Sequence, residues 1–178
     1  SADTTLVERM RIDSSGRVMI GTTTEGAANE AEELTIAGTG GVGMTIRSTD
    51  SGTSRIYFSD GTSGTPEYAG YQIYNHSSNA MIFGTNATER MRIDSSGHLL
   101  VGTTTEGEAS GDDLTIATTG NTGITIRSGT TGSGQVYFSD GTSGADEYRG
   151  YIQYQHSQNA LIFGTNAQER MRIDSSGN

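Results

Sequence analysis

A nine-residue motif written three times places the strongest constraint on this chain. The sequence Glu-Arg-Met-Arg-Ile-Asp-Ser-Ser-Gly occupies residues 8–16 and recurs without change at 89–97 and 169–177. The first step is 81 residues and the second is 80. Recurrence at a fixed spacing is the signature of a tandem array of one structural module. We therefore interpret the chain as repeated units rather than as one globule.

The motif itself predicts a β-hairpin. Met10 and Ile12 alternate with charged residues, which is the two-residue period of a strand with one apolar face. Residues 13–16 read Asp-Ser-Ser-Gly, in which Asp and Ser cap the backbone and Gly supplies a positive φ. Alternation resumes with Val18 and Ile20 on one face, so we expect a return strand after a loop of about four residues.

Further short strands fill the rest of each module. Polar loops follow the hairpin at 25–33 and at 107–113, and the second loop is one residue shorter. Apolar or aromatic stretches then alternate with segments rich in Gly, Ser, Thr and Asn, and no helical period persists. We expect an all-β chain whose strands include 34–36, 44–48, 56–58, 71–74 and 80–83, with equivalents at 114–116, 124–128, 136–138, 151–154 and 160–163.

The repeats also predict the domain organisation. We assign residues 8–88 to a first module and 89–168 to a second. Residues 1–7 would end a preceding module, and 169–178 would begin a third hairpin, so we expect the chain to be a piece of a longer protein.

Composition indicates that one copy of this chain is short of apolar side chains. Leu, Ile, Val and Phe make up 29 of the 178 residues, against 72 Ser, Thr and Gly. Such a chain has little material for a core of its own, and we expect three copies around a common axis to share apolar faces in an elongated homotrimer. The net charge of −10 argues against nucleic acid as a partner, and no apolar run is long enough to insert into a membrane.

Two stretches carry a resemblance to a known family. Residues 150–166, followed by 169–178, resemble the stalk repeats of bacteriophage tail fibres, which often precede an intramolecular chaperone of the endosialidase type. Residues 17–23 look like the usual continuation after the Ser-Ser-Gly turn. The resemblance implies a trimeric, extended shaft of the β-prism or triple β-helix kind. It also implies location in the virion, other tail fibre proteins as partners, and a distal tip that binds host glycan.

The three histidines are the first candidates for chemistry. His76 and His156 are equivalent, and in a trimer such residues could meet on the axis and bind a metal ion. A turn residue that hydrogen-bonds a neighbouring backbone group is the more economical interpretation. His98 stands where the first copy has Arg17, so it is not part of the repeating plan.

Acidic residues offer no convincing catalytic pair. Paired carboxylates are the basis of glycoside hydrolysis, but the only clusters lie in the polar loops, with no apolar pocket to raise a pKa. No Gly-x-Ser-x-Gly elbow frames a serine nucleophile. Single acids in two Ser-Asp-Gly turns carry too little charge for calcium. The residues considered are Glu30, Glu32, Glu33, Asp112 and Asp113 for the clusters, and Asp60 and Asp140 for the turns.

We therefore expect no catalytic, cofactor-binding or metal site, and a mechanical role as a shaft segment. Two alternatives remain: a glycan-binding module of a fibre or bacterial surface adhesin, using loops 25–33 and 49–55, and a polysaccharide depolymerase fragment. Tyrosines at 68, 71 and 74, and at 148, 151 and 154, we assign to subunit packing. The residues expected to hold the assembly together are Met10, Ile12, Ile36, Ile46, Phe58, Ile82 and Phe83, with Met91, Ile93, Ile116, Ile126, Phe138, Ile162 and Phe163.

Overall fold

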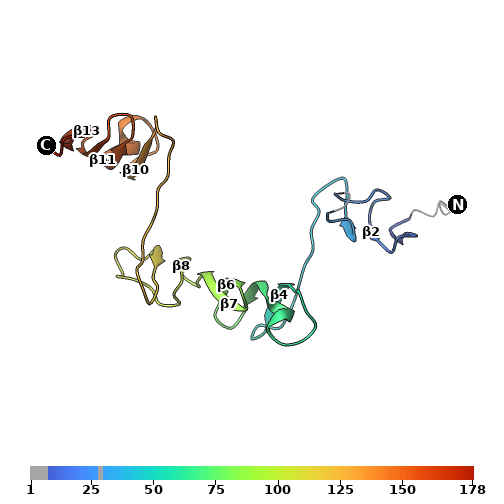
Figure 1. The fold of residues 1–178 in the computed structure, drawn as a ribbon. Helices are drawn as coiled ribbons and strands as arrows, with labels where there is room; N and C mark the ends of the chain where they lie inside the picture. Colours follow the sequence, from blue (N-terminus) through green and yellow to red (C-terminus); the bar gives the residue numbers. More distant parts are fainter. Residues whose placement is uncertain (1–7, 28–29) are drawn as a thin grey trace. The chain divides into compact units, whose positions relative to one another are not determined.

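A computed structural model describes residues 8–27 and 30–178, and Figure 1 draws it as a ribbon. Within these residues the regular elements are β-strands and two short 3-10 turns, which confirms the predicted all-β class. The described part of the chain contains no helix long and apolar enough to cross a membrane. Residues 1–7, which we assigned to a preceding module, lie outside the described residues.

The chain divides into two units, one ending at residue 117 and the other comprising residues 118–178. These units do not coincide with the sequence repeats at 8–88 and 89–168, because strand pairing continues across residue 88. The predicted module boundaries therefore describe the period of the sequence, whereas the units describe which strands are hydrogen-bonded together.

The first unit begins with a three-stranded sheet that contains the predicted hairpin. Strands β1 (Met10–Ile12) and β2 (Val18–Ile20) are antiparallel, with Met10 opposite Ile20. Their loop closes as expected, because the Ser15 N–H donates to Asp13 Oδ1 at 2.8 Å and Gly16 adopts a φ of 84°. Strand β3 (Leu34–Ile36) then lies parallel to β2.

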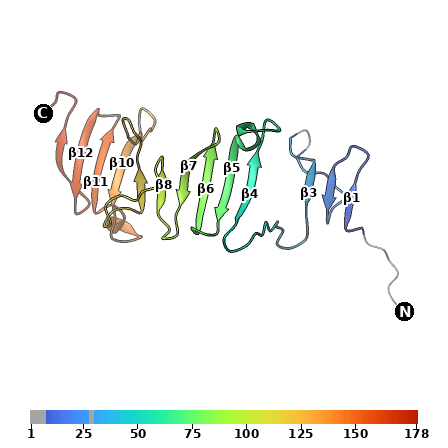
Figure 2. The same cartoon turned by 90° about the horizontal axis from the view of Figure 1, so that it is seen from below.

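The first unit also holds a six-stranded sheet in the order β4-β5-β6-β7-β8-β9. In Figure 2 the labelled strands of this sheet lie side by side in sequence order. Each neighbouring pair is antiparallel except the last, in which β9 runs parallel to β8 as β3 does to β2. The strands are β4 (Thr53–Phe58), β5 (Gly70–Asn75), β6 (Ala80–Thr85), β7 (Thr88–Ile93), β8 (Leu99–Val101) and β9 (Leu114–Ile116), with the 3-10 turn η1 (Thr65–Tyr68) between β4 and β5.

The second unit repeats the first four strands of that sheet. Its order is β10-β11-β12-β13, all antiparallel, and each strand corresponds to one of β4 to β7. The strands are β10 (Ser133–Phe138), β11 (Gly150–Gln155), β12 (Ala160–Thr165) and β13 (Gln168–Ile173), with η2 (Gly144–Tyr148) between β10 and β11.

The chain reverses direction between β6 and β7 through a tight two-residue turn. Asn86 and Ala87 both have positive φ, at 53° and 54°, which is the two-residue turn whose twist suits antiparallel strands. The pairing shifts register between Phe83 and Gly84, and the Tyr71 ring lies over Gly84, where a side chain would collide with it. The glycine is therefore required by the close approach of the ring.

The buried core is small and lies on the middle strands. Of the residues we expected to hold the protein together, only Ile82 and Ile162 are buried within the chain, and the others are half-buried or exposed. Burial in this chain instead uses small residues and two positions in the hairpins that we did not single out. The buried apolar residues among those described are Met19, Ala80, Ile82, Leu100, Ala160 and Ile162.

The prediction of strands at 44–48 and 124–128 was wrong for the chain by itself. Both segments lack strand pairing, and no backbone-to-backbone hydrogen bond within the described residues involves 38–48 or 118–128. Alternating apolar residues favour a strand, but a strand needs a neighbour to complete its ladder. The pattern is present at these positions, and this chain supplies no partner for it within the described residues.

Candidate functional site

An apolar groove recurs at equivalent positions in the two units. In the first it has a volume of about 130 Å³ and lies between Ile46 and the strands β4, β5 and β6. In the second it has a volume of about 330 Å³ and lies between the segment 124–126 and β10, β11 and β12. Seven lining positions match at a spacing of 80 residues: Ile46 with Ile126, Ser54 with Gly134, Arg55 with Gln135, Ile56 with Val136, Gln72 with Ile152, Tyr74 with Tyr154, and Met81 with Leu161.

Large apolar side chains next to these grooves face outward. Phe58, at the end of β4, is 64% exposed, and its equivalent Phe138 on β10 is 59% exposed. Ile46 and Ile126 are also exposed. Strands β4 and β10 are the terminal strands of their sheets in the described residues, so apolar side chains and unpaired edges occur together. An exposed, apolar edge is the usual template for pairing with another chain.

The segments 38–48 and 118–128, which make no backbone-to-backbone hydrogen bond within the described residues, add peptide groups to this surface. Backbone N–H and C=O groups are strong hydrogen-bonding groups, and in buried positions nearly all of them have partners. Burial of the exposed Ile46 and Ile126 in these segments would therefore be favoured by a partner that also offers hydrogen-bonding groups to their backbone. This arrangement is suited to β-type association between chains.

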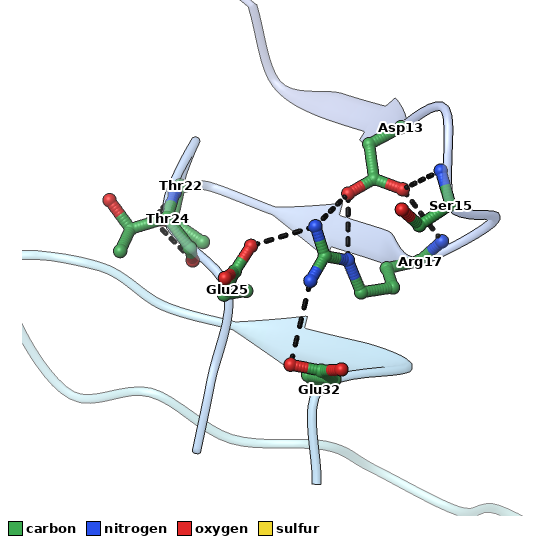
Figure 3. Close-up of polar contacts among 7 residues, drawn as sticks. All are labelled: Asp13, Ser15, Arg17, Thr22, Thr24, Glu25 and Glu32. Carbon is green, nitrogen blue, oxygen red and sulfur yellow. Dashed lines mark hydrogen bonds and ion pairs between the residues drawn. The ribbon is translucent and has the colours of Figure 1, made fainter. Parts of the chain in front are cut away.

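A second site lies at the hairpin turn of the first copy. Figure 3 shows the Arg17 side chain among three carboxylates. Its Nη2 lies 2.7 Å from Asp13 Oδ2 and 2.8 Å from Glu25 Oε2, and its Nη1 lies 3.4 Å from Glu32 Oε2. Asp13 follows β1, Glu25 follows β2 and Glu32 precedes β3, so the guanidinium joins the turn to the β2–β3 connection.

The same turn in the second copy places an imidazole where the first has a guanidinium. His98 Nδ1 lies 3.3 Å from Asp94 Oδ2 and 3.5 Å from Glu106 Oε1, and its Nε2 lies 3.8 Å from Asp112 Oδ1. These three acids are the counterparts of Asp13, Glu25 and Glu32. The carboxylates are retained in both copies while the basic residue between them changes.

The charges of these clusters are mutually dependent. In the first copy, the hydrogen bond from the Arg17 side chain is the main cause that lowers the pKa of Asp13. In the second copy, burial disfavours the charged imidazole, but the charges of Asp112, Asp94 and then Glu106 outweigh burial and raise the pKa of His98. Each cluster therefore favours a cation between its acids.

The other histidines occupy ordinary structural positions. His76 Nε2 lies 3.1 Å from Ser54 Oγ, and its ring meets Tyr74 edge-on at a centroid distance of 4.9 Å. His156 makes the same edge contact with Tyr154 at 5.0 Å. Both histidines lie in turns, as expected, but this hydrogen bond of the His76 ring goes to a side chain and not to a neighbouring backbone group. Neither histidine belongs to the group of possible metal ligands found in the described residues.

Two of the acidic candidates take part in the ion-pair clusters at the hairpin turns, and the acids of the Ser-Asp-Gly loops lie in other contacts. Glu32 and Asp112 join the Arg17 and His98 clusters, respectively. Asp140 pairs with Arg149 at 3.3 Å, and the Asp60 N–H donates to the Pro66 carbonyl in a closed loop. Sequence reasoning missed the cluster at His98, although the exchange of Arg17 for histidine between otherwise matching acidic positions was a signal for it.

The comparisons with known proteins add no identity: no family model matches the chain, and no curated protein matches its sequence significantly.

Proposed function

We propose that this chain is a shaft segment of a bacteriophage tail fibre and associates with two further copies of itself. Its role is mechanical, holding a distal receptor-binding tip away from the particle body. The observation that carries the proposal is the recurrence, in both units, of an apolar groove beside an unpaired extended segment.

The partner is a second copy rather than an unrelated protein, because the surface repeats at a spacing of 80 residues. A partner that covers both surfaces must offer complementary groups at the same spacing. Another copy of this chain does so, since it carries the segments 38–48 and 118–128 that need backbone partners. Symmetric association of identical chains is also the commonest route to soluble oligomers.

Three chains, rather than two, follow from the resemblance of residues 150–178 to tail fibre stalks. A three-fold arrangement lets one face of every sheet turn to a shared interior while the hydroxyl-rich face stays in water. The small core of each chain supports this, because only six apolar residues of the described part are buried without a partner. Association supplies the burial that a single chain lacks.

The test is the mass of the purified protein and its response to loss of the exposed aromatic rings. We expect light scattering to give three times the 18.7 kDa of one chain. The double variant Phe58→Ala/Phe138→Ala should lose the trimer, because truncation of large apolar groups at an interface removes much of the association energy. Trimers that persist unchanged in that variant would contradict the proposal.

A matched control is the double variant Thr62→Ala/Thr142→Ala, in the exposed loops that follow the same strands. It also changes one residue in each unit but removes little apolar surface, so its mass should equal that of the unaltered protein. A stable monomer for the unaltered chain would reject the shaft assignment outright.

A further inference from the structure

The two copies of the hairpin turn differ in what lies between their acids. In the first copy the guanidinium of Arg17 reaches all three carboxylates, and it lies less than 3 Å from those of Asp13 and Glu25. In the second copy the shorter imidazole of His98 comes no closer than 3.3 Å to any of them. Three carboxylates therefore surround a smaller group that carries a full positive charge only when protonated.

Two atoms at the centre of the second cluster are buried without a hydrogen-bond partner in the described residues. They are Asp94 Oδ2 and His98 Nδ1, which face each other. Buried polar atoms are nearly always paired in folded proteins, because an unpaired one keeps its full desolvation cost. Arg17 and Asp13, at the equivalent positions, satisfy each other by direct hydrogen bonds. The second copy keeps a carboxylate at each of the three positions, with Asp112 in place of Glu32, but lacks the guanidinium that pairs with them.

Together with Glu106, Asp94 and His98 place three possible metal-ligand atoms close to one another. One ligand atom each from Asp94, His98 and Glu106 lies within 4.8 Å of the other two, so one ion could contact all three. Asp112 Oδ1 lies on the other side of the ring, 3.8 Å from Nε2. A carboxylate behind the second ring nitrogen is the usual means of orienting a metal-bound histidine.

The donor set favours a transition metal over calcium or magnesium. Calcium and magnesium take oxygen ligands, whereas imidazole nitrogen combined with carboxylate oxygen suits Zn²⁺. Three protein ligands would leave a fourth position for water, and the Glu106 side chain is half-exposed, so an ion can enter from solvent.

We propose that Asp94, His98 and Glu106 bind one Zn²⁺ ion in the second copy, with Asp112 as the positioning residue for the imidazole. Arg17 supplies the corresponding positive charge in the first copy. Asp94 lies in the turn after β7, and Glu106 lies in the connection between β8 and β9. The ion therefore ties this connection to the turn, as the guanidinium does between β2 and β3.

Isothermal titration of the full chain with Zn²⁺, after removal of metal with a chelator, tests the site. We expect one equivalent per chain in the unaltered protein and none in His98→Arg. His98→Arg should fold normally, because the first copy uses Arg at this position, and circular dichroism will check that it does. Saturable binding that survives in folded His98→Arg, or no saturable binding by the unaltered chain, would overturn the proposal.

Two further variants test whether the ion lies at this cluster and not at the remaining histidines. His76→Asn/His156→Asn should keep the one equivalent, and loss of Zn²⁺ from that variant would assign the ion to those two residues instead. Arg17→His should bind a second equivalent, because it recreates the cluster among Asp13, Glu25 and Glu32. A single equivalent in Arg17→His would contradict the equivalence of the two turns.

Thermal unfolding provides a readout that does not depend on heats of binding. Zn²⁺ should raise the midpoint of the unaltered chain and leave that of His98→Arg unchanged, since a ligand stabilises only the state that binds it. An equal rise with Ca²⁺ in both proteins would indicate a site made of carboxylates alone and would reject the role of His98.

Discussion

Strands β1–β3 and β7–β9 are two copies of one arrangement, yet they lie in different surroundings. The hairpins pair in the same register, with Ile12 opposite Val18 and Ile93 opposite Leu99. Met10 is 62% exposed, whereas the equivalent Met91 is half-buried. The reason is that β7 also pairs with β6, while β1 has β2 as its only partner strand in the described residues. Identical residues thus differ in burial because of the strand beside them.

The two copies also differ in which basic residue faces the three carboxylates at the hairpin turn. Arg17 keeps its charge at any physiological pH, whereas the imidazole of His98 carries a positive charge only when it is protonated. The first copy therefore holds a permanent cation between its acids, and in our proposal a bound ion takes that place in the second copy. Substitutions at matched positions in the two copies can separate two contributions to their stability: the neighbouring strand, and the replacement of Arg17 by His98.

The largest expected effect comes from the buried residues at the centres of the two copies. Leu100→Ala should lower the free energy of unfolding of the six-stranded sheet by about 2–5 kcal/mol, because it leaves a cavity at a residue that is 1% exposed. Urea unfolding measures the change, and hydrogen exchange locates it. The equivalent Met19→Ala should affect only β1–β3, and lost protection in β7–β9 would contradict this separation.

A smaller effect is expected at β6, the strand that pairs with β7 and has no counterpart beside β1 in the described residues. In Gly84→Ala, the new Cβ would lie 2.1 Å from Cζ of Tyr71, and such overpacking costs about 1–3 kcal/mol. The loss should appear as faster hydrogen exchange in β6 and β7, with β1–β3 unchanged. Gly111→Ala is the control, since a Cβ there meets nothing within 4 Å. Equal destabilisation by both variants would rule out the ring contact as the cause.

The turn glycines should give a similar, modest effect in both copies. Gly16 and Gly97 have φ values of 84° and 93°, and a Cβ at either meets no atom within 4 Å. Replacement by Ala should therefore cost only backbone strain, about 1–2 kcal/mol. Thermal unfolding measures it, and the Asn variants should lose less because Asn tolerates this region. A large difference between the two Ala variants would show that the turns are not equivalent.

The smallest effect is a pH dependence at the hairpin turn of the first copy. The hydrogen bond from Arg17 is the main cause that lowers the pKa of Asp13 from its ordinary value of 3.8. A lowered folded-state pKa gives stability that is present above the ordinary value and is lost as pH falls through the lowered one. The protection of β1 and β2 against hydrogen exchange, corrected for the intrinsic pH dependence of the exchange rate, should therefore fall in acid. Asp13→Asn should flatten this dependence, and an unchanged acid response would contradict the assignment.

Local sequence patterns were sufficient to predict the hairpins and most of the paired strands. The alternation at Met10 and Ile12, followed by Asp-Ser-Ser-Gly, determined where the chain turns, because those residues act through their own backbone. The same alternation at 44–48 led to a wrong strand assignment, since pairing depends on a neighbour that the local pattern does not specify. The His98 cluster was missed because it joins residues from a turn and a loop.

The sequence by itself determined the period of the array, the all-β class and the chemistry of each turn, because these depend on residues close together in the chain. Only the tertiary structure decided that β7 has a neighbouring strand which β1 lacks within the described residues, and that Asp94, His98 and Glu106 lie within reach of one ion. Such features depend on distances between separate segments. Those distances are fixed by strand pairing, whereas the nine-residue motif is identical in the two copies.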